Sequence, residues 1–400
     1  TVTITKNSNN TLSSQVSMTQ DQLNFTNKYI PKNAVIDVEA TKLLTGRDAI
    51  PLKDGEFKFV LKSKDNSKVY KAENKADGKI LFTGLTFDKA GEYDYVLSEE
   101  QGTDDTITYD TTEKEVKIKV TDDGNGQLTA KITSDKVTIT NVYTPKKIKI
   151  PVTKIWDDHN NQDGKRPESI IVKLLADGNE TNKTVELNAG NNWTAKFTDL
   201  DADKGGVPIK YTIAEVNVPK GYTSVTSGEA KTGFTITNSY TPEKTSVEGT
   251  KTWDDANNQD GKRPDKIKVI LNKTVDGKTS KVAEKEVTKD NWNYEFTNLP
   301  KYEGGKEITY SIDEEAVPGY EKSIDGYNLK NSYTPEVVNV QGTKTWNDAN
   351  NQDGKRPDKI KVILNKTVDG KTSKVAEKEV TEKDNWNYEF TNLPKYEGGK

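Results

Sequence analysis

The stretch Phe234-Thr-Ile-Thr-Asn-Ser-Tyr-Thr-Pro242 has the alternation of a β-strand that buries one of its two faces. Alternate residues of a strand share a face, so Phe234, Ile236 and Tyr240 lie together and Asn238 lies among them. A side-chain amide that points into an apolar face needs a hydrogen-bond partner. The same tail, an Asn followed by Tyr and then Pro at two-residue steps, occurs at Asn27, Asn141 and Asn331.

These tails close repeated units. Residues 249–306 and 342–400 are nearly identical, and a more distant copy starts at Val152-Thr-Lys-Ile-Trp156. Residues 32–145 form a different unit, without Trp but with the same tail. A repeat of this length fits one small domain. We therefore expect a remnant of a preceding unit at 1–31, complete units at 32–145, 146–242 and 243–335, and a truncated unit at 336–400.

The remnant is expected from a match between residues 2–29 and the end of the unit at 32–145. Val2-Thr-Ile-Thr aligns with the strand pattern at Val116, and Leu23-Asn-Phe-Thr-Asn-Lys-Tyr29 aligns with the tail that contains Asn141. Both segments are predicted to be strands.

The composition excludes several classes of function. The chain has 400 residues, 31% of them hydrophobic and 30% charged, and its net charge of −4 includes no basic block typical of nucleic-acid binding. No apolar run is long enough for a membrane span. Cysteine is absent, so disulfides are excluded. The chain has one His, so metal sites and His-based catalysis have few candidate residues. We expect no cofactor and no metal.

Within each unit the hydrophobic period is that of β-structure. Ile267, Val269 and Leu271 alternate with polar or outward residues and run into a predicted turn at Asp276-Gly277. Short strands at regular spacing favour β-sandwiches, and the fold class predicted is all-β. The Thr-Pro links between units are short and favour a rod.

One Lys, one Glu and one Asn in each complete unit fall on the face that should be buried. An ionised Lys and Glu cost several kcal/mol each to bury, which calls for an explanation. The three sets are Lys42, Glu99 and Asn141; Lys154, Glu215 and Asn238; and Lys251, Glu314 and Asn331.

Two explanations fit each set. The first is a buried salt bridge with the Asn as a hydrogen-bond partner. The second is covalent: burial lowers the pKa of the Lys, and the neutral amine attacks the Asn side-chain carbonyl. The Glu transfers protons, ammonia leaves, and an isopeptide bond remains.

The motifs around these residues resemble the Cna B-type repeats of Gram-positive surface proteins. They are V-x-K-x-W, W-D-D-x-N-N-Q-D-G-K-R-P, Y-x-I-x-E-x-x-V-P-x-G-Y and I-T-N-S-Y-T-P. Residues 32–145 resemble the related streptococcal pilin isopeptide-linkage domain. The resemblance implies reversed Ig-like β-sandwiches, each with an autocatalytic Lys–Asn bond assisted by an acidic residue.

Carried over by position, the resemblance implies bonds Lys42–Asn141, Lys154–Asn238 and Lys251–Asn331, assisted by Glu99, Glu215 and Glu314. Glu100 is an alternative to Glu99 for the acid role. Asn27 and Lys344 have no partners of their own unit in the chain.

Two other motifs have weaker readings. The loop Asp157-Asp-His-Asn-Asn-Gln-Asp-Gly164 resembles a calcium loop, but its Gly is displaced by one position and its last ligand would be Ser169. A turn-rich loop is the preferred interpretation. Lys32, in Tyr29-Ile-Pro-Lys-Asn33, faintly resembles the pilin lysine that a sortase joins to the next subunit.

The sequence therefore predicts a segment of an extracellular stalk or adhesin attached to the cell wall of a Gram-positive bacterium. It is expected to be a monomeric rod, without turnover catalysis, nucleic acid or a membrane span, and joined to peptidoglycan by a sortase outside these residues. The alternatives are a module that binds a host matrix or cell-surface protein through residues 32–145, and a sortase-polymerised pilin subunit.

Overall fold

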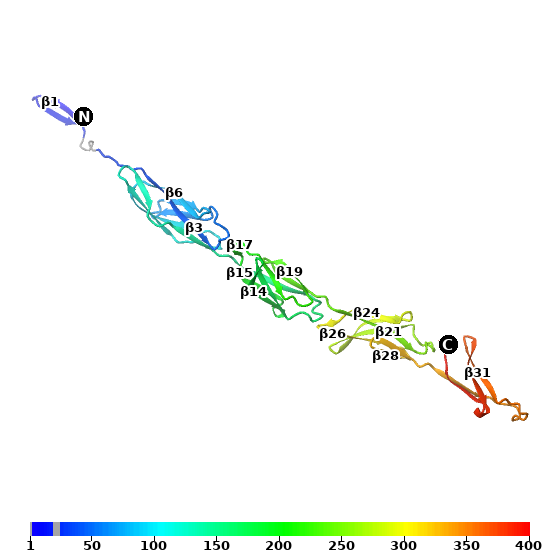
Figure 1. Ribbon diagram of the computed structural model, residues 1–400. Helices are drawn as coiled ribbons and strands as arrows, with labels where there is room; N and C mark the ends of the chain where they lie inside the picture. Colours follow the sequence, from blue (N-terminus) through cyan, green and yellow to red (C-terminus); the bar gives the residue numbers. More distant parts are fainter. Residues whose placement is uncertain (1, 19–24) are drawn as a thin grey trace.

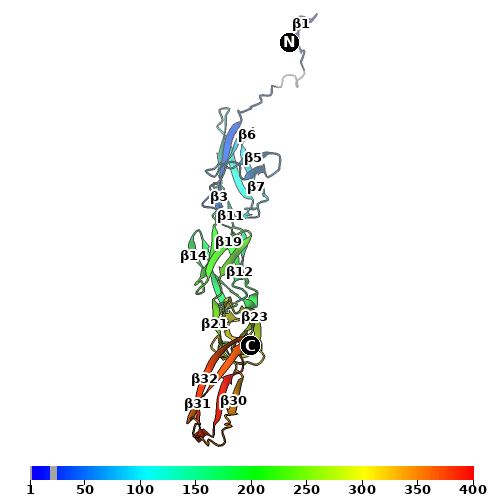
Figure 2. The ribbon, with the colours of Figure 1, turned by 90° about the vertical axis from the view of Figure 1, so that its right-hand side faces the viewer.

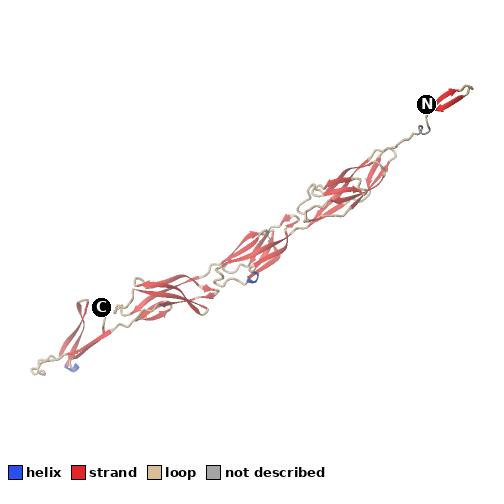
Figure 3. Cartoon of the chain, turned by 180° about the vertical axis from the view of Figure 1, so that it is seen from behind, coloured by secondary structure: helices blue, strands red, loops and turns tan. Residues whose placement is uncertain are grey.

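The computed structural model describes residues 2–18 and 25–400 as a string of β-structures arranged end to end in a rod (Figures 1 and 2). Strands and connecting loops make up almost all of it (Figure 3). Helical segments in the described part are limited to single 3-10 turns, η2 (Ala189–Asn191) and η3 (Glu382–Asp384). The predicted all-β class of tandem Ig-like sandwiches is confirmed.

The chain begins with an exposed antiparallel hairpin of β1 (Val2–Lys6) and β2 (Leu12–Val16). The strand expected at Val2-Thr-Ile-Thr is therefore present. The strand expected at 23–29 is wrong for its described part, because residues 25–30 are not in a strand; residues 23 and 24 lie outside the description. The matching tail at Asn141 is a strand because neighbours pair with it on both sides. Residues 25–30 have no such ladder.

The first sandwich packs a four-stranded sheet, in the order β6-β3-β11-β8, on a five-stranded sheet, in the order β10-β9-β7-β4-β5. The first sheet contains β3 (Ala34–Thr45), β6 (Lys79–Phe87), β8 (Ile107–Thr108) and β11 (Thr138–Tyr143). The second contains β4 (Lys58–Ser63), β5 (Val69–Glu73), β7 (Gly91–Glu99), β9 (Lys114–Asp122) and β10 (Leu128–Ile132).

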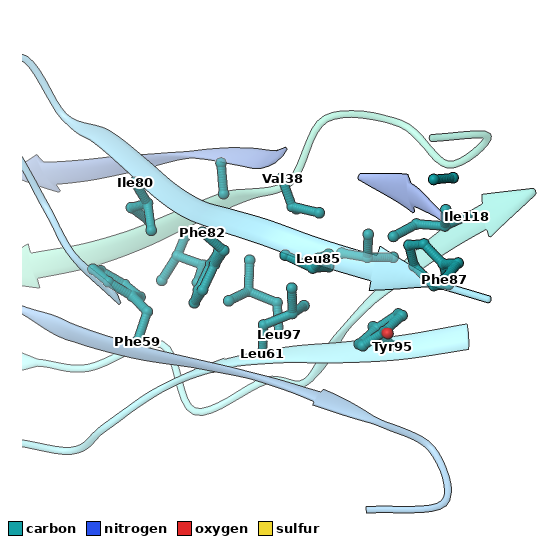
Figure 4. Close-up of a cluster of buried hydrophobic side chains, with 14 of the residues drawn as sticks. Val38, Phe59, Leu61, Ile80, Phe82, Leu85, Phe87, Tyr95, Leu97 and Ile118 are labelled. Atoms are coloured by element: carbon teal, nitrogen blue, oxygen red, sulfur yellow. The ribbon is translucent and has the colours of Figure 1, made fainter. Parts of the chain in front are cut away.

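The two sheets of the first sandwich meet in an apolar core. Phe59 and Leu61 of β4 and Leu97 of β7 face Ile80 and Phe82 of β6, and all are buried (Figure 4). Burying side chains of this size contributes about 1.5–3 kcal/mol each. The core therefore fixes the relative position of the sheets that carry the polar residues discussed below.

The second sandwich packs the sheet β15-β12-β20-β19 on the sheet β14-β13-β18, with a separate hairpin β16-β17. The first sheet and the hairpin contain β12 (Lys147–Asp157), β15 (Thr194–Asp201), β19 (Thr223–Glu229), β20 (Gly233–Ser239), β16 (Asp203–Lys204) and β17 (Val207–Pro208). The second sheet contains β13 (Ser169–Ala176), β14 (Asn179–Asn188) and β18 (Tyr211–Val216).

The third sandwich repeats this arrangement, with sheets β24-β21-β29-β28 and β23-β22-β27 and a hairpin β25-β26. The first sheet and the hairpin contain β21 (Lys244–Asp254), β24 (Asn293–Pro300), β28 (Glu321–Asp325), β29 (Asn328–Ser332), β25 (Tyr302–Glu303) and β26 (Lys306–Glu307). The second sheet contains β22 (Lys266–Val275), β23 (Lys278–Thr288) and β27 (Thr309–Glu314).

The predicted turn at Asp276-Gly277 joins β22 to β23, and both of its residues have positive φ. Beyond the third sandwich, two strand pairs reproduce the first half of the same fold. They are β30 (Val337–Thr343) with β33 (Asn387–Pro394), and β31 (Lys359–Val368) with β32 (Lys371–Thr381).

The second and third sandwiches meet through a loop and a hairpin. Gly305, between β25 and β26, donates its backbone N–H to the carbonyl oxygen of Gln162 at 3.0 Å. The approach is so close that a Cβ on Gly164 would lie 2.5 Å from the Cα of Gly305. Glu243 then bridges the two units by pairing with Lys165 at 3.1 Å and Lys301 at 3.0 Å.

The next junction repeats these contacts. Gly399 donates to the carbonyl oxygen of Gln259 at 3.0 Å, and a Cβ on Gly261 would lie 2.6 Å from the Cα of Gly399. Glu336 pairs with Lys262 at 3.2 Å and with Lys395 at 2.7 Å. Two junctions with the same backbone contact indicate a defined angle between units.

The contact at Gly164 predicts that a methyl group there disrupts the junction. Gly164→Ala forces the hairpin away, since no Cβ is tolerated at 2.5 Å from another Cα. Small-angle X-ray scattering should show a broader distribution of shapes or a bend. Gly277→Ala is the matched control, because its φ is also positive but nothing lies within 4 Å of the new Cβ. Identical scattering from both variants and the unchanged chain contradicts a rigid junction.

Candidate functional site

In each sandwich the first and last strands are parallel neighbours in one sheet. Lys42 of β3 pairs with Ile139 of β11, so Asn141 lies two residues further along the partner strand. Because residues two apart share a face, the Lys and Asn side chains project from the same side of the sheet. The register is the same elsewhere: Lys154 pairs with Ile236 and Lys251 with Leu329, each two residues before the Asn.

The acidic residue comes from the opposite sheet. Glu99 ends β7, Glu215 lies near the end of β18 and Glu314 ends β27. Each sits in the core-facing row of its strand, so the members of every predicted set face the same core. Glu100, the alternative to Glu99, instead pairs with Lys71 on the surface at 3.2 Å.

The set in the first sandwich is fully enclosed. Lys42 and Asn141 are 0% exposed and the Glu99 side chain 1%. Glu99 lies between the other two: its Oε2 is 2.6 Å from Lys42 Nζ, and its Oε1 accepts a hydrogen bond from Asn141 Nδ2 at 2.6 Å. The Asn141 Oδ1 accepts a hydrogen bond from the backbone N–H of Asp110 at 2.9 Å. A carboxylate that touches both amine and amide is placed to move a proton between them.

The set in the second sandwich differs in its hydrogen bonds. Asn238 Nδ2 donates to Glu215 Oε1 at 2.8 Å, as in the first sandwich. The other oxygen, Oε2, accepts from the Ser224 hydroxyl at 2.8 Å, and the only hydrogen bond described for Lys154 Nζ goes to its neighbour Ile155 O at 3.4 Å. The amine is therefore buried without a close carboxylate.

The set in the third sandwich has the Lys–Glu pair. Lys251 Nζ lies 2.8 Å from Glu314 Oε1 and 3.0 Å from Oε2, and only the contact to Oε2 has hydrogen-bond geometry. The Oδ1 of Asn331 is buried and has no hydrogen-bond partner among the described residues. A buried carbonyl oxygen of this kind costs free energy until it is satisfied or reacts.

An aromatic ring covers each amine. Lys42 Nζ lies 4.5 Å from the ring centroid of Phe57, Lys154 Nζ 4.2 Å from that of Trp156, and Lys251 Nζ 4.6 Å from that of Trp253. The rings exclude water, and desolvation lowers the pKa of all three amines. For Lys154 the pKa falls from 10.5 to about 8. A lowered pKa raises the fraction of neutral, nucleophilic amine at physiological pH.

The two remaining half-sets lie on the surface. Asn27 and Lys344 are both exposed. Lys344 Nζ lies 4.8 Å from the Trp346 ring centroid, so the local Lys-x-Trp arrangement forms even there. Lys32 is exposed, and its backbone pairs with the turn at Gly126 and Gln127.

The loop after the first strand is turn-rich, as preferred from sequence. Asp158 uses both carboxylate oxygens on protein donors: Arg166 contacts both, and the Tyr222 hydroxyl donates to Oδ2 at 2.9 Å. Asp255, Arg263 and Tyr320 form the same group in the third sandwich. No group of three or more metal-ligating side chains occurs in the part of the chain that the structure describes.

Sequence reasoning missed what the tail tyrosines do. The hydroxyl of Tyr240 donates to Asp163 Oδ2 at 2.9 Å, and the same oxygen accepts the N–H of Glu243 at 2.8 Å. Tyr333 and Asp260 repeat this pair, and Tyr143 reaches Asp203 of the following unit at 2.7 Å. The sequence feature that could have revealed this role is the constant spacing of two residues between each Asn and its Tyr. It places the Tyr at the junction between units whenever the Asn lies in the buried set.

Two models of known protein families match segments of the chain. The Cna protein B-type domain matches residues 150–239, 247–332 and 340–400. The Spy0128-like isopeptide containing domain matches residues 38–144. No helix in the described ranges has the length and hydropathy of a membrane span.

Similar proteins come from Staphylococcus aureus. Its collagen adhesin is 46% identical over 282 residues, which cover 70% of this chain and 23% of that protein. The serine-aspartate repeat-containing protein D of strain Newman is 30% identical over 217 residues, 48% of this chain and 15% of that protein. The chain thus spans less than a quarter of either relative. The crystal structure of two B repeat units of the collagen binding protein is 35% identical, covers 92% of this chain and 91% of that one, and has a TM-score of 0.44.

The lowered pKa of Lys154 predicts that the stability of the second sandwich depends on pH in a variant whose Lys154 amine cannot react with Asn238. In Asn238→Ala the amine stays titratable, with a pKa of about 8 when folded against 10.5 when unfolded. Between these values the unfolded chain binds more protons, so the free energy of unfolding rises with pH. Below pH 8 both states are protonated and the effect is constant. Calorimetry from pH 7 to about 10.5 measures this rise in the free energy of unfolding. The transition to follow is the one that melts at the lowest temperature, which we assign to the altered second sandwich.

The control for that experiment is the double variant Lys154→Met, Asn238→Ala, which has no amine to titrate. The single variant should gain stability relative to the double variant as the pH rises. Parallel profiles for the two would contradict a buried amine with a lowered pKa.

Proposed function

Because the chain belongs to the Cna protein B-type domain family, we propose that it is a load-bearing segment of a Gram-positive cell-surface stalk. In this proposal each complete sandwich is locked by one isopeptide bond between its first and last strands. The bonds are Lys42–Asn141, Lys154–Asn238 and Lys251–Asn331. The units are those at 32–145, 146–242 and 243–335.

The observation that carries the proposal is the repetition of one buried arrangement in two kinds of sandwich. Lys and Asn share a face at the same register in all three, and a Glu approaches from the other sheet. A salt bridge alone would need no Asn at a fixed step from the Lys. In the second sandwich Lys154 lacks a close carboxylate, which a purely electrostatic role does not explain.

The bonds form once per domain and the protein performs no turnover. The neutral amine attacks the Asn Cγ, the Glu moves a proton from the amine to the leaving nitrogen, and ammonia departs. The product has no charge on the former Lys, which removes the cost of burying it. The closed loop also restricts the unfolded chain, which by analogy with a disulfide contributes about 4–5 kcal/mol.

The junctions support the mechanical part of the proposal. Loop–hairpin contacts of the same kind join the second sandwich to the third and the third sandwich to the strands that follow it. Such contacts would pass tension from one unit to the next along the rod. We propose an extracellular location, attachment to the cell wall outside these residues, and a monomeric state. Near-identical tandem repeats suit a spacer that projects another part of the protein.

A second function is favoured by one observation, the similarity to a collagen adhesin. Under it, the first sandwich binds a host matrix protein. A groove of about 300 Å³ lies between Asp37–Ala40 and Ser134–Val137. Its lining has no aromatic side chain, so it lacks the feature expected of a ligand groove, and the stalk remains the preferred function. A pilin role through exposed Lys32 has less support, because its Tyr-x-Pro-Lys context recurs at Lys146 in a link.

The proposal predicts the intact mass of the denatured chain. Each bond expels one ammonia, about 17 Da, so the mass should fall short by three such units. Glu314→Ala should restore one unit and Glu99→Ala another. Glu315→Ala is the matched control, because this neighbour is exposed and faces Lys268 instead. A full mass for the unchanged chain would mean that the three sets are unreacted buried polar groups, and it would favour the binding module.

The same bonds predict the response to force. Pulling the ends of the unchanged chain should release no length from between Lys251 and Asn331. Glu314→Ala should add one unfolding event of roughly 280 Å of extended chain, measured by optical tweezers. An event of that size in the unchanged chain would rule out a bond in the third sandwich.

A further inference from the structure

The reactive carbonyl of the first sandwich has a hydrogen-bond donor that the other two lack. The backbone N–H of Asp110 points at Asn141 Oδ1 from 2.9 Å. In the part of the chain described, Asn238 Oδ1 and Asn331 Oδ1 are buried and have no partner. The three sets therefore differ at the oxygen that would become negatively charged during the attack.

The orientation of the Asn141 amide is fixed by its neighbours. A carboxylate only accepts hydrogen bonds and a backbone N–H only donates. The amide nitrogen must therefore face Glu99 and the oxygen must face Asp110, as observed. If the amide were turned over, its oxygen would face the Glu99 carboxylate and its NH₂ group would face the Asp110 N–H, and neither pair could form a hydrogen bond.

The sheet explains why this N–H is available. In the first sandwich the ladder between β8 and β11 ends at Thr108 and Val142, one pair before it would reach Asn141. The chain then leaves the sheet and turns Asp110 toward the side chain. In the other sandwiches the neighbouring strand runs past the Asn, with Ser224 opposite Asn238 and Lys322 opposite Asn331.

The loop also holds Asp110 in place. Its carboxylate Oδ1 accepts the backbone N–H of Thr112 at 3.0 Å and the hydroxyl of the same residue at 2.5 Å. Its Oδ2 lies 3.4 Å from Lys114 Nζ. The side chain thus caps its own turn, and the backbone N–H stays aimed at Asn141.

We propose that the Asp110 backbone N–H is an oxyanion donor for the Lys42–Asn141 reaction. The inference rests on the proposed function. The neutral Lys42 amine forms a bond to Asn141 Cγ, and the carbonyl electron pair moves to Oδ1, where the N–H stabilises the charge. Glu99 takes a proton from the former amine and gives it to Nδ2. The Cγ–Nδ2 bond breaks, ammonia leaves, and Glu99 ends in its starting state.

The test removes one N–H from the full chain. Cell-free synthesis with an α-hydroxy acid at position 110 replaces the amide by an ester, and the product is collected in denaturant before it folds. After refolding, the loss of about 17 Da is timed separately for each of the three Lys–Asn pairs by digestion and mass spectrometry. Removal of one oxyanion donor should slow the Lys42–Asn141 bond by roughly 10²-fold. The other two bonds should form at their usual rates.

A control ester sharpens the result. An ester at Thr111, whose N–H is not the donor to Asn141, should leave all three rates unchanged. An Asp110 ester that forms its bond as fast as the Thr111 ester overturns the proposal.

A second measurement needs no altered backbone. In the unchanged chain the Lys42–Asn141 bond should form before the other two, since only its carbonyl has a donor in place. A Lys42–Asn141 bond that forms last contradicts the proposal. If no pair in the unchanged chain loses ammonia, the isopeptide function itself fails, which is a different outcome from three bonds with an insensitive Asp110.

Discussion

The parallel pairing of the first and last strands is the constraint on which the sites depend. It places a Lys and an Asn that are far apart in sequence on neighbouring strands at one register. A slip of one residue would turn either side chain to the other face of the sheet. The apolar core resists such a slip, because it would expose a row of buried residues such as Ile139 and Ile236.

The three sites share this strand pairing but differ in the hydrogen bonds that surround the buried amine. All of them desolvate an amine under an aromatic ring, and desolvation is the first cause of each lowered pKa. The carboxylate bridges amine and amide in the first sandwich, contacts the amide and Ser224 in the second, and contacts the amine in the third. The backbone pairing is therefore more strictly repeated than the hydrogen bonds it supports.

Much of this was accessible from sequence, because period-two alternation identifies which side chains point inward. That logic located Lys42, Glu99 and Asn141 and the turn at Asp276-Gly277. It failed at Phe25 to Tyr29, where the pattern of a strand exists without a ladder to hold it. It also could not identify the backbone N–H groups of Asp110 and Gly305 as hydrogen-bond donors to Asn141 and Gln162, because every residue except proline has such a group. Their roles depend on where a ladder ends and on how two units touch.

Under the proposed function, the spacing between each Asn and the next Lys sets the length of chain that carries tension between units. The same number of residues separates Asn141 from Lys154, Asn238 from Lys251, and Asn331 from Lys344. With the proposed bonds in place, tension bypasses the long loop between each Lys and its Asn and runs only through these short links. The chain between Lys42 and Asn141 is longer than the chain between Lys251 and Asn331, yet the link that follows it is no longer. Insertions inside a domain would thus change its surface and leave the extensibility of the stalk unaltered.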